Sequence, residues 1–185
     1  MPGPIVHIRT FTGKEINLFK IKPEDICIED IAHALANINR FNGHVKKPIS
    51  VAQHSIYVAR LCEGHGCELQ GLLHDAAEAY IGDITKWLKR TEAMTAFRHL
   101  EADIQRTIFK KFKCDTIQHK MVSKADKIMV RFEGMKGFDK NFKIDHPHYP
   151  NLTEQEIENV GKWGFWRWRE SERLFLDHFR LYNET

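Results

Sequence analysis

Apolar residues recur at intervals of three and four along most of this 185-residue chain, and this spacing is the strongest constraint on its fold. In segment 24–39 they step by three, four and three: Ile28, Ile31, Leu35 and Ile38. Such a period places the apolar side chains on one face of an α-helix. The sequence therefore predicts amphipathic helices over 24–39, 50–62, 68–81, 91–113, 116–133 and 165–182.

Local signals mark the ends of these helices and a short β-structure before them. Two residue pairs have the spacing of capping boxes, which satisfy unpaired backbone amides at a helix start: Ser50 with Gln53, and Thr153 with Glu156. Residues 4–19 alternate weakly around Gly13, which is typical of a β-hairpin. The proline-broken segment 145–150 predicts a loop. We therefore expect a single all-α domain over residues 1–185, a helical bundle with a small N-terminal β-hairpin.

Composition and charge exclude several kinds of protein. Hydrophobic residues make up 42% of the chain and charged residues 29%, an ordinary globular balance that excludes a largely disordered chain. The net charge of +3 is too small to indicate a polyanion partner, and the sequence has no nucleic-acid recognition motif. No apolar run approaches the roughly 20 residues of a membrane-spanning helix. We therefore expect neither a nucleic acid nor a membrane as partner.

The first residues and the cysteines indicate a cytoplasmic protein. Residues 1–10 lack the charged-then-apolar layout of a secretion signal. Cys62 and Cys67 flank His65, as in a zinc knuckle, but no second pair at ligand spacing completes such a site. Reduced thiols are the better interpretation of the four cysteines.

The segment 72–80, Leu-Leu-His-Asp-Ala-Ala-Glu-Ala-Tyr, carries the strongest chemical signal. His74 and Asp75 are adjacent, and on a continuous helix Glu78 shares a face with both. These polar groups lie among Leu and Ala, where a core is expected, and buried charges are costly unless they are paired or bind a metal. Taken alone, Glu78 could be a surface acid and His74 a satisfied core residue.

Two adjacent ligands leave the coordination of a metal incomplete, so others must converge from elsewhere. His54 is the best third candidate, because it lies among apolar residues on the preceding helix. Asp126 is the best fourth, because a lone Asp has poor propensity near the middle of a helix. Asp126 alone could instead pair with Lys127 or Arg131 on an exposed face. The joint pattern of a His, a His-Asp pair and an Asp on three helices favours a metal, and mixed N/O ligands suit zinc, manganese, cobalt or iron(II) better than calcium.

At these positions the sequence resembles the HD-domain phosphohydrolase superfamily, whose metal site is a His, a His-Asp pair and a distant Asp. Within this superfamily it is similar to bacterial 5′-deoxynucleotidases of the YfbR type. It is more similar to phage-encoded triphosphohydrolases of the DatZ type, which act on dATP. The resemblance covers residues 24–135 and rests on four segments: Ile38-Asn-Arg-Phe41, Gln53-His-Ser55, His74-Asp-Ala-Ala-Glu78 with Gly82-Asp83, and Lys124-Ala-Asp126.

This resemblance implies roles for individual residues. Four residues would hold a divalent metal, zinc first and cobalt, manganese or magnesium as alternatives: His54, His74, Asp75 and Asp126. Glu78 would be the acid/base group beside a water molecule, and Arg40 would bind the phosphoryl group that is cleaved. Asp83 would orient the water or contact the sugar.

The resemblance also implies how the substrate is bound. Phe41 would pack on the deoxyribose and leave no room for a 2′-hydroxyl, although relatives frequently have Trp there. Lys89 lies where the family has a phosphate-binding lysine. Relatives often have a further lysine where this chain has Ser123, so Lys124 is the nearest substitute for that contact.

We therefore expect a metal-dependent phosphohydrolase that cleaves the 5′ phosphate ester of a 2′-deoxynucleotide. A deoxynucleoside triphosphate such as dATP is the first choice, since lysines stand at 46, 47, 86 and 89; the products would be deoxynucleoside and triphosphate. The alternatives are a 5′-deoxynucleotidase acting on monophosphates and a non-catalytic nucleotide sensor, against which the presence of Glu78 and Asp83 argues. We also expect a homo-oligomer, although aromatic clusters such as the one at 163–168 belong to a core more often than to an interface.

Overall fold

The computed structural model describes residues 7–144, 149 and 151–184 and is mostly helical. At its N-terminal side β1 (His7–Arg9) pairs antiparallel with β2 (Glu15–Asn17). Gly13 lies in the turn between them with a φ of 88°, a backbone conformation that glycine adopts at little cost. The predicted all-α class with an N-terminal β-hairpin is confirmed. Residues 4–6 of the expected hairpin, and 145–148 and 150 of the expected loop, lie outside the described residues.

Nine α-helical segments follow in the described part of the chain, some of them a single turn long. They are α1 (Ile28–Asn37), α2 (Val51–Leu61), α3 (Glu68–Leu73), α4 (Glu78–Ile81), α5 (Lys86–Lys89), α6 (Thr95–Lys111), α7 (Lys120–Gly137), α8 (Glu154–Val160) and α9 (Trp168–Asn183). Short 3-10 turns occupy Leu18–Lys20, Pro23–Asp25, Arg40–Gly43 and Glu92–Met94. Within the described ranges, no helix combines the length and the apolar character needed to cross a bilayer.

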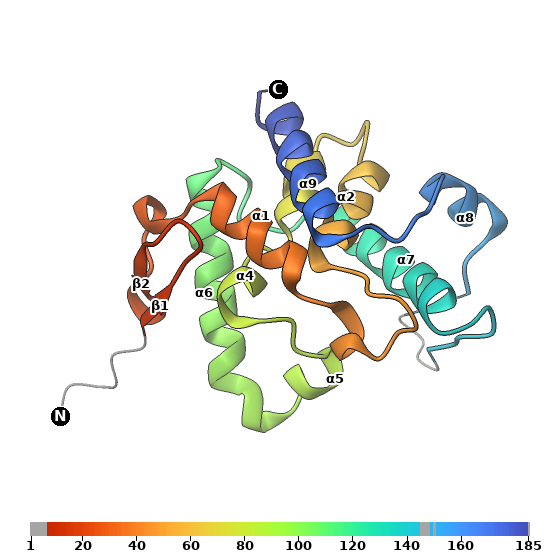
Figure 1. Ribbon diagram of the computed structural model, residues 1–185, viewed down its shortest axis with the longest axis horizontal. Coiled ribbons are helices and arrows are strands. Elements are labelled where there is room, and N and C mark those ends of the chain that lie inside the picture. Colours follow the sequence, from red (N-terminus) through yellow and green to blue (C-terminus); the bar gives the residue numbers. More distant parts are fainter. Residues whose placement is uncertain (1–6, 145–148, 150, 185) are drawn as a thin grey trace.

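The centre of the fold is α2, whose residues 51–59 are all buried. They are buried because five helices contact α2: α1, α3, α7, α8 and α9. In Figure 1 the hairpin and α6 lie on one side of α1 and α2, while α7 and α8 lie on the other. One apolar cluster joins α1, α2, α3, α6 and α9, and a second joins α2 to α7. This packing brings the helices that carry His54, the His74–Asp75 pair and Asp126 to one place.

The two expected capping boxes differ in the structure. Thr153 and Glu156 form a complete box at the start of α8, as predicted. At α2 only half of the box forms: the Ser50 hydroxyl accepts a hydrogen bond from the Gln53 backbone N–H. The Gln53 side chain turns away and binds the backbone of the 163–168 segment, at Gly164 and Trp166. The sequence spacing did not reveal this competing partner, which is 111 residues further along the chain.

Several helix boundaries are corrected by tertiary contacts. The expected helix at 116–133 begins at Lys120 and extends to Gly137, because Gln70 binds the backbone of the preceding segment at Asp115, Ile117 and His119 and keeps it out of the helix. The last helix begins at Trp168, not at 165. Residues 163–167 before it have no regular secondary structure, and the rings of Trp163 and Trp166 pack on Tyr57 with centroids 4.8 and 5.3 Å from its own. The expected helix at 91–113 begins as a 3-10 turn and becomes α-helical at Thr95.

Candidate metal and phosphate site

Three of the expected metal ligands meet between α2 and the end of α3. The Nε2 atoms of His54 and His74 are 3.3 Å apart, and the Asp75 carboxylate lies 3.2 Å from His74 Nε2 and 3.7 Å from His54 Nε2. These three residues form a group that could hold one metal ion. Asp126 of α7 is a further neighbour, with a carboxylate oxygen 3.4 Å from His54 Nε2. The structure therefore brings together all four residues for which the sequence predicted a metal.

The spacing of these atoms fits a single transition-metal ion. Zinc binds imidazole nitrogens and carboxylate oxygens at about 2.0–2.2 Å, so neighbouring ligand atoms in a tetrahedral site are about 3.3–3.6 Å apart. The three separations within the His54, His74 and Asp75 group, between 3.2 and 3.7 Å, are close to that value, and Asp126 lies 3.4 Å from His54 but outside this group of mutually close ligand atoms. Two imidazole Nε2 atoms facing each other and two carboxylates also form the N/O donor set that suits zinc and its neighbours.

Hydrogen bonds on the far side of each imidazole leave the facing nitrogens available to a metal. His74 Nδ1 lies 2.8 Å from the carbonyl oxygen of Gly71, which can only accept, so this nitrogen carries a proton. His54 Nδ1 lies 3.0 Å from a carboxylate oxygen of Glu133. A carboxylate or carbonyl behind an imidazole is the usual arrangement around a metal-binding histidine, because it fixes the tautomer and the orientation of the ring.

The helix predicted over 68–81 is wrong in one respect: it is interrupted between His74 and Ala77. The side-chain amide of Gln105, on α6, is inserted where Ala77 N–H would donate to Leu73 in a continuous helix. Ala77 N–H donates to Gln105 Oε1 (2.9 Å), and Gln105 Nε2 donates to the Leu73 carbonyl (2.7 Å). A side chain inserted into the helix ladder breaks or kinks the helix. The break separates the His74–Asp75 pair at the end of α3 from Glu78 at the start of α4.

Arg40 is held beside the candidate ligands by two carboxylates. Its Nε donates to Glu133 Oε2 at 2.8 Å, and its Nη1 lies 3.6 Å from Asp75 Oδ2. Sequence reasoning missed Glu133, which is fully buried on α7. A signal was present, because Glu133 follows Asp126 by seven residues, two helical turns, and so lies on the same face of the helix.

Protonation of two site residues is shifted by their surroundings. Burial opposes the charge on His54, as does Arg40, but the Glu133 carboxylate and the hydrogen bond with Asp126 outweigh both and raise the pKa of His54 to about 9. Burial, with the Asp75 and Asp83 carboxylates, raises the pKa of Glu78 well above its ordinary value, which the cation of Lys89 opposes. A buried carboxyl with a raised pKa is the state required of a general acid near neutral pH.

Comparison with known proteins shows which family the chain belongs to. No protein-family model matches the sequence. The uncharacterized protein YfdR of Escherichia coli (strain K12) is 38% identical over 126 residues, which cover 68% of this chain and 69% of YfdR. The chain belongs to the YfdR family. The uncharacterized protein RCAP_rcc00048 of Rhodobacter capsulatus is 40% identical over 84 residues, 41% of this chain and 43% of that protein. The names of both relatives assign no activity, so the site itself is the guide to the chemistry of this YfdR-family protein.

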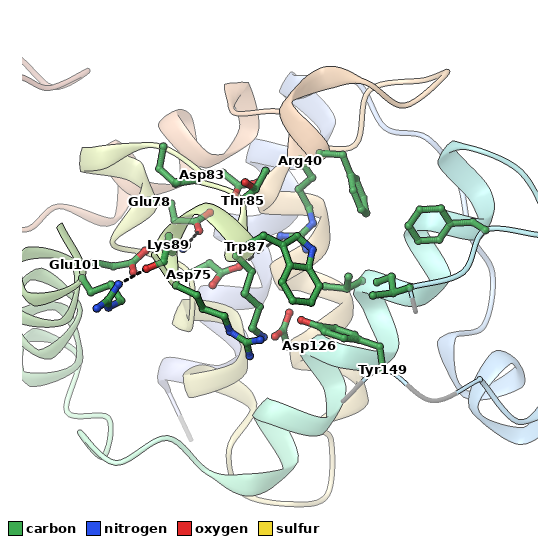
Figure 2. A pocket seen from close by; sticks show the side chains of 18 residues that line it. Arg40, Asp75, Glu78, Asp83, Thr85, Trp87, Lys89, Glu101, Asp126 and Tyr149 are labelled. Atoms are coloured by element: carbon green, nitrogen blue, oxygen red, sulfur yellow. Dashed lines mark hydrogen bonds and ion pairs between the residues drawn. The ribbon is translucent and has the colours of Figure 1, made fainter. Parts of the chain in front are cut away.

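A cavity of about 480 Å³ opens beside the candidate ligands, and Figure 2 shows its lining. Glu78, Lys89 and Glu101 lie on the left in that view, with Lys89 reaching toward both acids, and Arg40 lies at the top. Lys89 Nζ is 3.3 Å from Glu78 and 2.7 Å from Glu101. The second carboxylate oxygen of Glu78 is buried and has no hydrogen-bond partner among the described residues. Asp83, which follows the helix-ending Gly82, also lines the cavity.

Phe41 lines the same cavity in an unusual backbone conformation. Its φ of 55° and ψ of 30° lie in the left-handed region, which costs an ordinary residue free energy. Edge-to-face contacts with Phe138 and Phe142 fix its ring, with centroids 5.4 and 6.3 Å away. Gly134 makes room for this wall, because a Cβ there would lie 2.0 Å from the Phe142 ring. Phe41, which was predicted to pack on the deoxyribose, therefore lies at the cavity, and two aromatic rings hold its side chain in place.

One predicted substrate-binding residue is not brought to the cavity. The Lys124 side chain is 62% exposed and lies 3.8 Å from Glu156 of α8. It precedes Asp126 by two residues, and side chains two apart on a helix point to different faces. Neither Lys46 nor Lys47 lines the cavity, whereas Lys86 does. Sequence reasoning missed other lining residues, which come from segments that only the fold brings together: Trp87, Arg90, Arg98, Glu101 and Tyr149.

Proposed function

We propose that this YfdR-family protein is a divalent-metal-dependent phosphohydrolase of the HD type, which cleaves the 5′ phosphate ester of 2′-deoxynucleotides. One observation carries the proposal: three candidate ligand atoms with metal-site spacing, with Asp126 beside His54, adjoin a guanidinium and a buried carboxyl at one cavity. Its volume of about 480 Å³ lies within the range of pockets that take small molecules.

The residues of the site would have separate roles in ester hydrolysis. His54, His74, Asp75 and Asp126 would hold the ion, zinc first and cobalt, manganese or magnesium as alternatives. When bound, such an ion is a Lewis acid that activates water and polarises a phosphoryl oxygen. Arg40 would bind the charge that develops on the phosphoryl oxygens, and its position between Glu133 and Asp75 keeps it oriented before substrate arrives.

Glu78 would move the proton. Water attacks the α-phosphorus, the bond from phosphorus to the 5′ oxygen breaks, and the leaving oxygen takes a proton. A carboxyl that is buried, with its pKa raised and one oxygen without a partner among the described residues, can hold a proton for that step. Lys89, bound to Glu78, would limit this rise in pKa and keep Glu78 able to release the proton again. Asp83, on the same wall, would orient the water or contact the sugar.

The substrate proposed first is a deoxynucleoside triphosphate such as dATP, cleaved to deoxynucleoside and triphosphate. Cationic side chains line the cavity beyond Arg40, which favours several phosphates: Lys86, Lys89, Arg90 and Arg98. A flat apolar ring at Phe41 cannot satisfy a 2′-hydroxyl, which favours the deoxy sugar.

A monophosphate 5′-deoxynucleotidase is the second candidate, and a specific observation favours it. Two of the four cations are already engaged by the protein. Lys89 binds Glu78 and Glu101, and Arg98 donates to the backbone carbonyls of Lys89 and Thr91. The charge of Lys89 is thereby partly neutralised, and hydrogen-bond donors of Arg98 are already used, before a β- or γ-phosphate arrives. A cytoplasmic location and a homo-oligomeric state are further proposals, the former favoured by the free thiols of all four cysteines.

The deciding experiment incubates the zinc-loaded protein with the four common bases as ribo- and deoxynucleotides, each as mono- and triphosphate, and identifies the released phosphate species. Triphosphate released from dATP supports the first candidate, and orthophosphate released only from deoxynucleoside monophosphates supports the second. Binding of deoxynucleotides without release of any phosphate would point to the non-catalytic sensor and contradict both enzymes.

A further inference from the structure

The Glu133 carboxylate has partners on both of its oxygens, and both partners belong to the candidate site. Oε1 lies 3.0 Å from Nδ1 of His54, a candidate metal ligand. Oε2 accepts a hydrogen bond of 2.8 Å from Nε of Arg40, the candidate phosphate-binding residue. Glu133 comes from α7 and bonds residues 79 and 93 positions earlier in the chain.

The burial of this carboxylate is a strong constraint. The Glu133 side chain is 0% exposed, and an ionised carboxylate out of contact with water is costly unless it is paired and hydrogen-bonded. His54 is also 0% exposed and the Arg40 side chain 10%. Water is therefore excluded from this part of the site, and the three side chains depend on one another for their hydrogen bonds.

Asp75 closes the group into a ring. Its Oδ2 lies 3.6 Å from Arg40 Nη1 and 3.7 Å from His54 Nε2, so Arg40 and His54 are each flanked by Glu133 on one side and Asp75 on the other. A movement of Arg40 or His54 would disturb its contacts with both Glu133 and Asp75. The metal-binding end of His54 and the guanidinium of Arg40 are thereby held in a fixed relation.

We infer that Glu133 is a positioning residue that couples metal binding at His54 to phosphate binding at Arg40. This inference rests on the proposed function. Oε1 holds the proton of His54 on Nδ1 and leaves Nε2 for the ion. Oε2 holds Arg40 by Nε, so the terminal guanidinium nitrogens, of which Nη1 lies 3.6 Å from Asp75 Oδ2, are not bound to Glu133 and would reach the phosphoryl oxygens. One rigid carboxylate therefore sets the distance between the ion and the cationic partner of the phosphate.

If Glu133 only formed a structural ion pair, its replacement would lower stability but leave the affinities for zinc and phosphate unchanged. Two substitutions distinguish this possibility from coupling. Glu133→Ala removes both contacts, whereas Glu133→Gln keeps the shape. The amide oxygen of Gln can accept from His54 or from Arg40 but not from both, and the amide N–H groups then face the N–H of the other residue, where no hydrogen bond can form. Asp30→Asn is the matched control, because Asp30 is another buried carboxylate with two partners, the backbone and hydroxyl of Thr12, outside the cavity.

Two affinities are measured for each protein: zinc alone, by competition with a chromogenic chelator, and inorganic phosphate bound to the zinc-loaded protein, by titration calorimetry. We expect Glu133→Ala to weaken zinc binding about 10- to 100-fold. We expect Glu133→Gln to weaken one of the two affinities about tenfold or more: phosphate affinity if the amide turns its N–H groups toward Arg40, and zinc affinity if it turns them toward His54. Asp30→Asn should lower the melting temperature and change neither affinity.

Retention of wild-type zinc and phosphate affinities in Glu133→Gln, with only a lower melting temperature, would overturn the coupling and leave the proposed function standing. Failure of the wild type to bind zinc or any of the alternative ions, cobalt, manganese and magnesium, would overturn the proposed function and the coupling with it. If Glu133→Ala does not fold, the affinities of the isosteric Glu133→Gln variant alone test the coupling.

Discussion

Replacing Phe41 by alanine and by glycine tests whether the aromatic wall of the cavity is held in a strained backbone. Both changes remove the edge-to-face contacts with Phe138 and Phe142, each worth about 0.5–1.5 kcal/mol, so each variant should lose about 1–3 kcal/mol of unfolding free energy. The backbone at position 41 is left-handed, with φ 55°, which costs an L-residue about 1–2 kcal/mol and glycine almost nothing. The glycine variant should therefore be more stable than the alanine variant by about 1 kcal/mol. At an ordinary helical or extended position the order is reversed.

Urea unfolding of the three proteins measures the stability order, and kcat/KM for dATP and ATP measures the function of the wall. Burying an unpaired hydroxyl costs about 1–3 kcal/mol, so the wild type should prefer dATP by about 5- to 150-fold. Both variants should reduce the ratio of kcat/KM for dATP to kcat/KM for ATP, mainly by raising kcat/KM for ATP. A glycine variant less stable than the alanine variant would refute the strained backbone. Equal kcat/KM for dATP and ATP in the wild type would refute sugar selection by Phe41.

Three further predictions concern the chemistry and its support. Glu78→Gln should still bind zinc and nucleotide but turn over at least about 100-fold more slowly; an unchanged rate removes Glu78 from proton transfer. Gln105→Leu should let Ala77 bond Leu73 directly, close the helix break and misplace Glu78, so the rate should fall about 100-fold while zinc binding persists; a normal rate would show that the break is irrelevant. Zinc must displace a proton from His54, whose pKa is raised to about 9, so zinc affinity should increase about tenfold per pH unit between pH 6 and 8, and a flat profile would contradict this. In the metal-free protein the same raised pKa stabilises the fold below about pH 6.5, and unfolding experiments should show that this contribution disappears as the pH rises through about 9.

The sequence predicted most of what depends on local spacing. Apolar periodicity identified the longer helices and their packed faces, and the His54, His74–Asp75 and Asp126 pattern identified side chains that the fold gathers around His54 Nε2, at distances of 3.3 to 3.7 Å. The capping box at Thr153 was also predictable, because both partners lie three residues apart and the backbone bonds they make are local.

What the sequence did not predict depends on partners distant in the chain. The break after Leu73 requires the side chain of Gln105, which is 32 residues away, and periodicity alone favours a continuous helix there. The role of Glu133 depends on partners 79 and 93 residues away. Lys124 was expected at the phosphate because it adjoins Ser123, where relatives often have a lysine, yet a separation of two residues from Asp126 on α7 directs it toward Glu156.

The most direct test of the central proposal is metal removal and replacement during dATP hydrolysis. The purified protein is stripped with a chelator, dialysed and titrated with zinc or cobalt, and the released deoxyadenosine is followed alongside the bound metal. We predict that activity is lost on stripping and returns in proportion to the metal bound, and that His74→Ala and Asp126→Ala stay inactive at every metal concentration. Full activity of the metal-stripped wild type would contradict a metal-dependent phosphohydrolase.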